Sequence, residues 1–396
     1  MACPYVGVGK FILNNPRNYN KFAAKWINLY LMALQCGIIG ITNVGKTTIF
    51  NCISNTKGET NAFAFSATKS NMGVVQVPDP RLYELEKHQV TDRIVHTTVE
   101  IVDIPGLAKG SNKGEGVGNK FLGDIRNTDA LIHVLRCFDN DALPHIDGSV
   151  DPVRDLETID LELQVKDLES VEKKIERLKR AARAGDKDAK RGLEVLNNYR
   201  EHFENFNNAR TLEVKEDDRK YVDDLFLLTI KPVMYVCNVD ENSAVGGNKY
   251  IERVKEFLKG KNAEILVIAG AIEAEIAELE NNEDRLAFLK DAGLAEPGVD
   301  KLVRAAYKML NLQTFFTVGP MEIRAWTIKT GMTAPRAAGV IHSDLERGFI
   351  RSEVMKYHDF VTLGSEHACK EAGKFYIEGK NYIVEDGDIL HIRFNV

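Results

Sequence analysis

The sequence predicts an α/β protein in which a mostly parallel sheet is interrupted by a helical segment and followed by a smaller α+β domain. Short apolar runs of strand length alternate with loops and amphipathic stretches from residue 34 to about 137, and this pattern resumes at 231. Between the two parts, apolar residues recur at spacings of three, four or seven, which indicates helices. The helical segment is therefore predicted to be an insertion within one α/β domain.

The predicted strands of the parallel sheet are 36–39, 99–103, 130–135, 231–237 and 264–268. A helix is predicted to open at Thr47, behind the first strand and its loop. The helical spacing of the insertion is carried by Leu161, Leu168, Val171, Ile175, Leu178 and Ala182. Gly185-Asp186-Lys187 predicts a turn, and a second helix through Leu193, Leu196 and Tyr199 would complete a helical hairpin or short coiled coil.

A third pattern begins at about residue 315, where short strands are separated by glycine turns. The predicted strands are 322–328, 382–384 and 389–394, with one helix near 345–357. This pattern fits a small α+β domain. The expected organisation is an extension at 1–31, the α/β domain in two parts at 34–150 and 226–312, the insertion at 151–225, and the C-terminal domain at 315–396.

Residues 1–31 contain basic side chains but no acidic one. We expect this extension to result from a start codon assigned too early or to be disordered, with a targeting peptide as the alternative. No function is assigned to it.

The chain carries a net charge of −6 with 28% charged residues, as a soluble, mildly acidic protein does. This overall charge does not favour binding to nucleic acid, so any RNA contact has to come from a local patch. The basic stretch 173–183 is either such a patch or a solvated helix face.

No run approaches the ~20 apolar residues of a membrane-spanning helix. The six cysteines include no C-x-x-C pair, which predicts reduced thiols of a cytoplasmic protein.

The strongest functional signal is the run Gly40 to Thr47, which fits the phosphate-binding pattern G-x-x-x-x-G-K-[ST] between a predicted strand and a predicted helix. Its glycines allow a tight turn whose N–H groups face phosphate oxygens at a helix N-terminus. We expect Lys46 to reach the terminal phosphates of a nucleotide and the Thr47 hydroxyl to face Mg²⁺.

A second element, the D-x-x-G run Asp103 to Gly106, ends another predicted strand. Asp103 is expected to hold Mg²⁺ through water, and the Gly106 amide to bind the γ-phosphate. Leu107 follows, where Ras-like enzymes have a glutamine that orients the attacking water. Because leucine cannot hydrogen-bond water, we expect slow intrinsic hydrolysis. The glycine-rich stretch 108–118 is expected to be a mobile switch.

The third element, Asn238-Val239-Asp240-Glu241, stands where GTPases carry the guanine-binding motif N-K-x-D. Val239 replaces the lysine that packs on the base, and Glu241 is one methylene longer than aspartate. Both changes weaken the argument for guanine, because a site built for a donor pair loses its preference when the geometry changes. The alternative is that Asn238 merely caps a turn. The run 269–272 is expected to pack around the other side of the base.

In these motifs the chain resembles the Obg-like ATPase family, also called YchF, over about residues 34–396. The resemblance is carried by 43–47, 103–118, 238–241, 324–327, 338–342 and 379–388. It implies a GTPase-like P-loop domain that prefers ATP to GTP, an inserted helical coiled-coil domain, and a C-terminal TGS domain with a β-grasp fold. It further implies a Mg²⁺-dependent, ribosome-associated ATPase linked to translation and stress, with the large subunit and rRNA as partners and with neither membrane nor DNA binding.

The resemblance also assigns roles to single residues. His145 falls on a histidine proposed to move toward the nucleotide, which makes it a catalytic candidate beside Lys46 and Gly106; the alternative is an ordinary loop histidine. Val239 is implied to bind through its backbone. The residues expected to bind the nucleotide are Asn43, Val44, Gly45, Lys46, Thr47, Thr48, Asn238, Val239, Gly270 and Ala271.

Two positions depart from the family pattern. Thr42 stands where the family usually has proline, which should be tolerated. Ala67 stands where a threonine would complete the Mg²⁺ coordination, so either Thr68 replaces it or Mg²⁺ keeps a water there. Two other functions stay open: a nucleotide-gated ribosome-binding scaffold with incidental hydrolysis, which Leu107 favours, and a conventional GTPase, against which Val239 and Glu241 argue.

Overall fold

The computed structural model describes residues 34–54, 71–105, 117–279 and 281–395. The predicted extension 1–31 therefore lies outside the described residues. Apart from Leu34, the described residues belong to one unit, Gln35–Val396. None of the helices in the described ranges has the length and apolar character needed to span a membrane.

The first sheet is the predicted, mostly parallel one. Its strands are β1 (Gln35–Ile39), β2 (Asn71–Gln76), β4 (Thr98–Asp103), β5 (Ala130–Arg136), β6 (Val233–Asn238) and β7 (Glu264–Ile268), in the order β2-β4-β1-β5-β6-β7. All neighbours are parallel except β2 and β4. The five predicted strands are confirmed, whereas β2 was not among them. Every residue of β5 is buried, as expected for a central strand covered on both faces.

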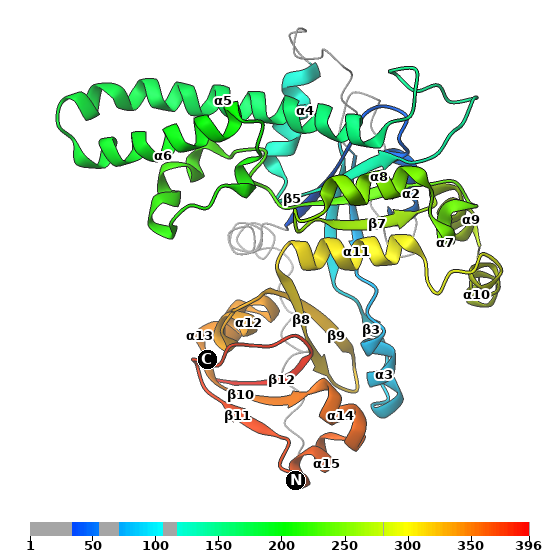
Figure 1. Cartoon of the computed structure of the whole chain (residues 1–396). Coiled ribbons are helices and arrows are strands. Elements are labelled where there is room, and N and C mark those ends of the chain that lie inside the picture. Colours follow the sequence, from blue (N-terminus) through cyan, green and yellow to red (C-terminus); the bar gives the residue numbers. More distant parts are fainter. Residues whose placement is uncertain (1–33, 55–70, 106–116, 280, 396) are drawn as a thin grey trace, which may run out of the picture. The chain divides into compact units, whose positions relative to one another are not determined.

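Helices cover both faces of this sheet. They are α2 (Lys46–Ser54), α4 (Val117–Asn127), α7 (Ser243–Gly246), α8 (Lys249–Leu258), α9 (Gly270–Glu278), α10 (Asn282–Asp291) and α11 (Gly298–Met309). Alternation along β7 shows how the layers form: Ile265 and Val267 pack into the core under α8, whereas Ile268 lies against Gly298 of α11. Figure 1 accordingly shows α8 and α11 on either side of β7.

Two antiparallel helices occupy the stretch between β5 and β6. These are α5 (Pro152–Arg183) and α6 (Lys187–Glu204), followed by the short 3₁₀ helices η3 (Ala209–Thr211), η4 (Glu216–Tyr221) and η5 (Asp223–Leu225). Asp151 and Asp186 cap the two helices, because each side chain accepts hydrogen bonds from the first-turn N–H groups. Val171, Leu196 and Tyr199 are buried between the helices. The turn lies at Gly185, where φ is +97°.

The second sheet comes mainly from the C-terminal part of the chain. Its strands are β8 (Leu312–Val318), β9 (Ile323–Lys329), β10 (Phe349–Lys356), β11 (Tyr376–Glu378), β12 (Asp388–Phe394) and β3 (Ile94–Val95), in the order β11-β10-β12-β8-β9-β3. Its helices are α12 (Ala334–Ile341), α13 (Ser343–Arg347), α14 (Tyr357–Leu363) and α15 (Glu366–Glu371). Apolar side chains form one core on each face of this sheet. One core contains Phe315 and the other contains Phe316.

Two predictions for this region are wrong. The helix predicted near 345–357 is a short helix, α13, followed by the strand β10, which pairs with both β11 and β12. The apolar residues of that stretch fit both the helical period of about 3.6 residues and the strand period of about 2. Hydrogen bonding to a neighbouring strand on each side stabilises the strand. The predicted strand 382–384 is an irregular segment that forms only an isolated bridge between Ile383 and Thr333. The sequence patterns also did not predict β11.

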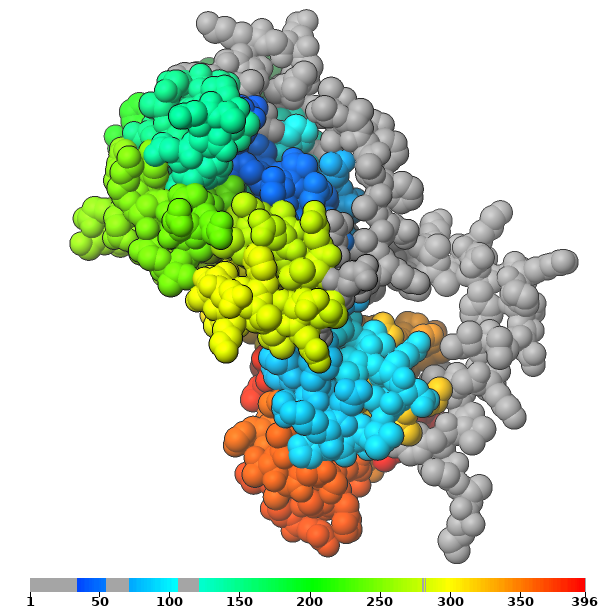
Figure 2. Space-filling model, turned by 90° about the vertical axis from the view of Figure 1, so that its right-hand side faces the viewer, coloured from blue at the N-terminus to red at the C-terminus, as the bar shows by residue number. Residues whose placement is uncertain are grey.

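The connection between β2 and β4 lies against the second sheet rather than the first. It forms α3 (Arg81–His88) and β3, and β3 pairs in parallel with β9. Leu82 and Leu85 of α3 are fully buried in the same core as Phe316. Figure 2 shows this light-blue segment packed against the orange C-terminal part. The second sheet therefore contains a piece of chain that lies more than two hundred residues earlier in the sequence.

Candidate functional site

The run Gly40 to Thr47 connects β1 to α2 at the carboxyl edge of the first sheet. The turn needs left-handed backbone, with φ of +62° at Asn43 and +95° at Gly45. α2 then begins at Lys46, so the N–H groups of its first turn, which have no partner within the helix, face the space that the loop encloses. The predicted strand, loop and helix are all present. Such an edge, at the carboxyl ends of parallel strands, is where open α/β sheets bind ligands.

Asn238, the last residue of β6, ties this loop to the turn after β7. Its Nδ2 donates to the Val44 carbonyl at 2.8 Å, and its Oδ1 accepts from the Gly270 amide at 3.0 Å. The side chain is buried. Asn238 does more than cap a turn of its own strand, because both of its partners belong to predicted nucleotide-binding segments.

Lys46 is buried, and its Nζ donates to the Ile41 carbonyl at 2.6 Å. The ammonium is thus held inside the curve of the phosphate loop. Burial lowers the pKa of Lys46 to about 8, against the opposing charge of Asp103. A group whose charge is this poorly solvated is suited to bind an anion, because a phosphate would replace the lost hydration.

Thr47 and Asp103 lie together, as predicted. The Thr47 hydroxyl donates to Oδ2 of Asp103 at 2.9 Å. The other oxygen, Oδ1, is buried and has no hydrogen-bond partner among the described residues. Burial raises the pKa of Asp103, although Thr47 and Lys46 oppose the shift. An unpartnered carboxylate oxygen beside a hydroxyl fits the hard-oxygen donor set of Mg²⁺, either directly or through water.

The predicted base side of the site is the loop after β6. Val239 is buried, and its N–H donates to the Ile268 carbonyl at 2.9 Å. The carboxylate of Asp240 accepts from the backbone N–H and the hydroxyl of Ser243, each at 3.1 Å. Glu241 is exposed. Asp240 is therefore engaged in a local turn, whereas Glu241, which stands at the position of the guanine-binding aspartate, has an exposed side chain.

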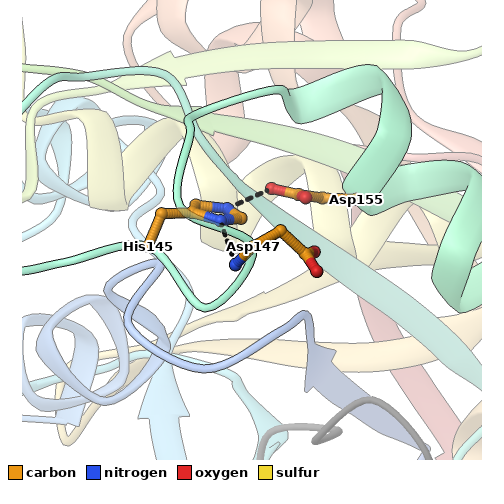
Figure 3. A group of neighbouring side chains, drawn as sticks. All are labelled: His145, Asp147 and Asp155. Atoms are coloured by element: carbon orange, nitrogen blue, oxygen red, sulfur yellow. Dashed lines mark hydrogen bonds and ion pairs between the residues drawn. The ribbon is translucent and has the colours of Figure 1, made fainter.

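His145 lies in the loop between β5 and α5, with both ring nitrogens hydrogen-bonded (Figure 3). Nδ1 accepts from the Asp147 amide at 3.1 Å, so Nε2 carries the proton and donates to Asp155 Oδ2 at 2.9 Å. Both side chains are almost fully buried. The Asn43 amide donates to the Pro144 carbonyl at 3.5 Å, which places the loop beside the phosphate loop. The ring itself is bound to α5.

His145, Asp147 and Asp155 also have their ligand atoms within 4.8 Å of one another, a spacing that a metal ion could bridge. Arg154 already supplies the positive charge there, with Nη2 3.3 Å from Asp155 and Nε 3.7 Å from Asp147. A cation would have to displace this guanidinium. The cluster is therefore explained by its own ion pairs, and we assign no metal to it.

Several predicted residues cannot be placed. Gly106, Leu107, Ala67 and Thr68 lie outside the described residues, as do residues 108–116 of the predicted switch. Thr48 and Ala271 are described and exposed in the first turns of α2 and α9. No sequence pattern identified Asp155 as the partner of His145, since an acid in the first turn of a helix is common.

Five of the six cysteines lie in the described residues: Cys36, Cys52, Cys137, Cys237 and Cys369. All five are buried with free thiols, which agrees with the prediction of reduced core residues. Cys3 lies outside the described residues.

Two family descriptions match parts of the chain. Residues 35–191 match a family described as 50S ribosome-binding GTPase, and residues 312–395 match YchF-GTPase_C, described as a protein of unknown function. Together they include the phosphate loop, Asp103, α5 and the strands β8 to β12.

The chain is also similar to proteins over nearly its whole length. A Haemophilus ducreyi protein named Ribosome-binding ATPase YchF is 48% identical over 365 residues, which cover 92% of this chain and 100% of that protein. A Bacillus subtilis protein of the same name is 47% identical over 367 residues, with the same coverage. A solved structure, described as the Schizosaccharomyces pombe YchF GTPase, superimposes with a TM-score of 0.81 at 33% identity, covering 91% of this chain and 98% of that one.

Proposed function

This chain belongs to the YchF family, and on that premise we propose that it is a ribosome-associated ATPase that hydrolyses ATP slowly with Mg²⁺, in preference to GTP. Its nucleotide state would act as a switch in translation and stress regulation. The relatives are named as ribosome-binding ATPases. The geometry of this chain bears on Mg²⁺ binding, on the choice of base and on the rate of hydrolysis.

The observation that carries the proposal is the arrangement of Lys46, Thr47 and Asp103. In it a poorly solvated ammonium lies beside a hydroxyl and a carboxylate oxygen that lacks a partner. Thr47 and Asp103 would hold Mg²⁺, which would neutralise charge on the phosphates. Lys46 and the loop amides would stabilise the charge that develops on the transferred phosphoryl group.

A preference for ATP is supported by the hydrogen bonds around Val239. The Val239 N–H is hydrogen-bonded to Ile268 of β7, so we propose that the Val239 carbonyl is the backbone group that hydrogen-bonds the base. A carbonyl accepts from the amino group of adenine but repels the carbonyl oxygen that guanine carries in the same place. Glu241 stands where GTPases have the aspartate that binds the guanine donors, and its extra methylene changes the geometry on which that preference depends.

Slow hydrolysis is supported by two residues. Leu107 stands in the glutamine position and cannot orient water. His145, the other candidate, has its Nε2–H bound to Asp155 and would have to leave that bond before acting on water near the γ-phosphate. We therefore propose that release of His145 is part of the catalytic cycle.

The proposed partners are ATP and ADP, the large ribosomal subunit and rRNA; this partner would place the protein in the cytoplasm. Contact with RNA would come from the second sheet and from the basic stretch of α5, residues 173–183, because the net charge of the whole chain does not favour it.

Calorimetric titration with non-hydrolysable ATP and GTP analogues, with and without Mg²⁺, tests the proposal. We expect tighter binding of the ATP analogue and a loss of affinity without Mg²⁺. Tighter binding of the GTP analogue would instead support a conventional GTPase and contradict the proposal that the Val239 carbonyl favours adenine over guanine.

A second measurement separates an enzyme from a scaffold. Single-turnover ATP hydrolysis is compared with and without ribosomes. A large stimulation by ribosomes supports a cycle driven by hydrolysis, whereas nucleotide-dependent ribosome binding with an unchanged slow rate supports the scaffold.

A further inference from the structure

A pocket of about 510 Å³ lies at the edge of the first sheet opposite the phosphate loop. Its lining includes Val233 and Glu264, the first residues of β6 and β7, whereas Asn238 and the turn after β7 belong to the other ends of the same strands. The remaining walls come from α5, the segment at 208–211, and the carboxyl ends of α8 and α11. Its volume falls within the range of roughly 300–1,000 Å³ that is typical of small-molecule sites.

Positive side chains from three separate segments line this pocket: Arg210, Lys261 and Lys308. Neither lysine forms an ion pair or hydrogen bond through its ammonium group with a described residue; Lys261 instead lies 3.7 Å from the ring centroid of Phe257. Both lysines are exposed, so an anion would replace only water at their ammonium groups. Both ammonium groups are therefore available to an anion.

The acidic groups of the lining do not cancel this charge. Oδ2 of Asp160 accepts from Asn208 Nδ2 at 2.8 Å, and its Oδ1 lies 3.8 Å from Arg210, so that guanidinium already compensates it. Glu264, the other acid, is exposed. Lys261 also favours the charged form of Asp160 electrostatically. Three cations against two carboxylates therefore leave one excess positive charge in the lining as a whole.

The floor of the pocket offers a directed hydrogen-bond donor. The Tyr235 hydroxyl is buried and accepts from Arg210 Nη2 at 3.4 Å, while no described residue accepts its own proton. Burial raises the pKa of Tyr235 to about 12, so the hydroxyl stays protonated at neutral pH. A buried donor without an acceptor is costly unless a ligand or water binds it.

We infer that this pocket is a second ligand site, separate from the nucleotide site, for a small organic anion with an apolar body. The anionic group binds Lys261 and Lys308 and accepts the hydrogen bond of Tyr235. The apolar body packs on Phe257 and on the apolar side chains Leu156, Val233 and Met309, which also line the pocket.

The probe for this site is anilinonaphthalene sulfonate, which combines an anionic head with an aromatic body and fluoresces in apolar surroundings. The full-length chain is titrated with the probe in saturating Mg²⁺ and ADP. We expect one binding site per chain that the nucleotide does not displace. The neutral analogue phenylnaphthylamine should bind at least fivefold more weakly, since it lacks the anion.

Substitutions locate the site. Lys261→Gln and Lys308→Gln are each expected to weaken probe binding about fivefold, and Tyr235→Phe about threefold. Lys259→Gln is the matched control, because Lys259 is exposed two residues from Lys261 but does not line the pocket. Equal melting temperatures of the lysine variants exclude probe binding to unfolded chain.

Four results would overturn the inference. They are absence of probe binding, displacement of the probe by ADP, equal affinity for the neutral analogue, and no effect of Lys261→Gln and Lys308→Gln beyond that of Lys259→Gln. None of these results bears on ATP hydrolysis, so the proposed function stands or fails independently.

Discussion

The side chain of Asn238 lies so close to Gly45 that a Cβ atom at position 45 would come within 2.2 Å of its Nδ2 atom. The last residue of β6 thus contacts two consecutive residues of the phosphate loop, Val44 and Gly45. The loop is held in its binding shape by a residue nearly two hundred positions away in the sequence.

Replacing Asn238 by alanine is expected to weaken ATP binding about tenfold or more. The change leaves the Val44 carbonyl and the Gly270 amide without partners, which should also lower the free energy of unfolding by about 1–3 kcal/mol. Calorimetry and urea unfolding measure the two effects. Asn242→Ala is the control, because Asn242 is exposed in the following loop; equal behaviour of the two variants would refute the bridging role.

Lys46→Met is expected to abolish ATP binding while raising the free energy of unfolding at pH 7 by about 1–3 kcal/mol, because an apolar side chain avoids burying the charge. The folded pKa of about 8 lies below the unfolded value of 10.5. The penalty is therefore complete below pH 8 and disappears as the pH rises toward 10.5. Urea unfolding at pH 7 and pH 10 should show the gap between wild type and Lys46→Met closing; a gap independent of pH contradicts this origin.

Nucleotide binding should take up a proton at alkaline pH. A bound phosphate stabilises the charged form of Lys46, so its pKa rises from about 8 on binding. Titrations at pH 8.5 in two buffers of different ionisation enthalpy should give apparent enthalpies that differ by the proton taken up. At pH 7 Lys46 is already mostly protonated, and the difference should largely disappear. An equal difference at both pH values would argue against Lys46 as the group.

Asp155→Ala is expected to raise single-turnover ATP hydrolysis several-fold, because it removes the hydrogen bond that holds the His145 ring against α5. The value of such a buried bond, about 1.5–3 kcal/mol, sets the upper limit of the gain. His145→Ala should slow hydrolysis, and the double variant should match His145→Ala. If Asp155→Ala accelerates hydrolysis equally in the absence of His145, the histidine is not the group released.

Leu82→Ala is expected to destabilise the second sheet by about 2–5 kcal/mol, since Leu82 is fully buried beside Phe316. Hydrogen exchange should show faster exchange in β8, β9 and β12, even though the substitution lies in the connection between β2 and β4. Glu86→Ala, on the exposed side of the same helix, serves as the control. Faster exchange confined to α3 would mean that this helix does not support the second sheet.

Sequence reasoning predicted the parallel sheet well because its strands are short apolar runs next to recognisable loops. It failed at β10 and at 382–384, where the decision depends on pairing partners such as β11 and β12. No local pattern reveals that Ile94 pairs with Ile323, because that contact depends on how the completed parts of the chain meet.

The candidate site was likewise predicted only in part from the sequence. The phosphate loop and Asp103 were found because their chemistry requires fixed spacings along the chain. The sequence patterns did not predict three hydrogen bonds of the site, because each depends on the direction of a side chain. These bonds join His145 to Asp155, Asn238 to Val44, and Ser243 to Asp240. The first of these contacts, together with the hydrogen bond from the Asp147 amide, sets the tautomer of the histidine.

The crossing of α3 and β3 into the second sheet means that the two structural halves are interlaced and cannot be separated by one cut. A chain ended at residue 311 would keep Leu82, Leu85 and Ile94 but lose the strands that cover them, and their apolar surface would favour aggregation. A fragment beginning at residue 312 would lack the strand that borders β9. Recombination or loss of the C-terminal part alone is therefore disfavoured, and the two halves are constrained to evolve as one inherited unit.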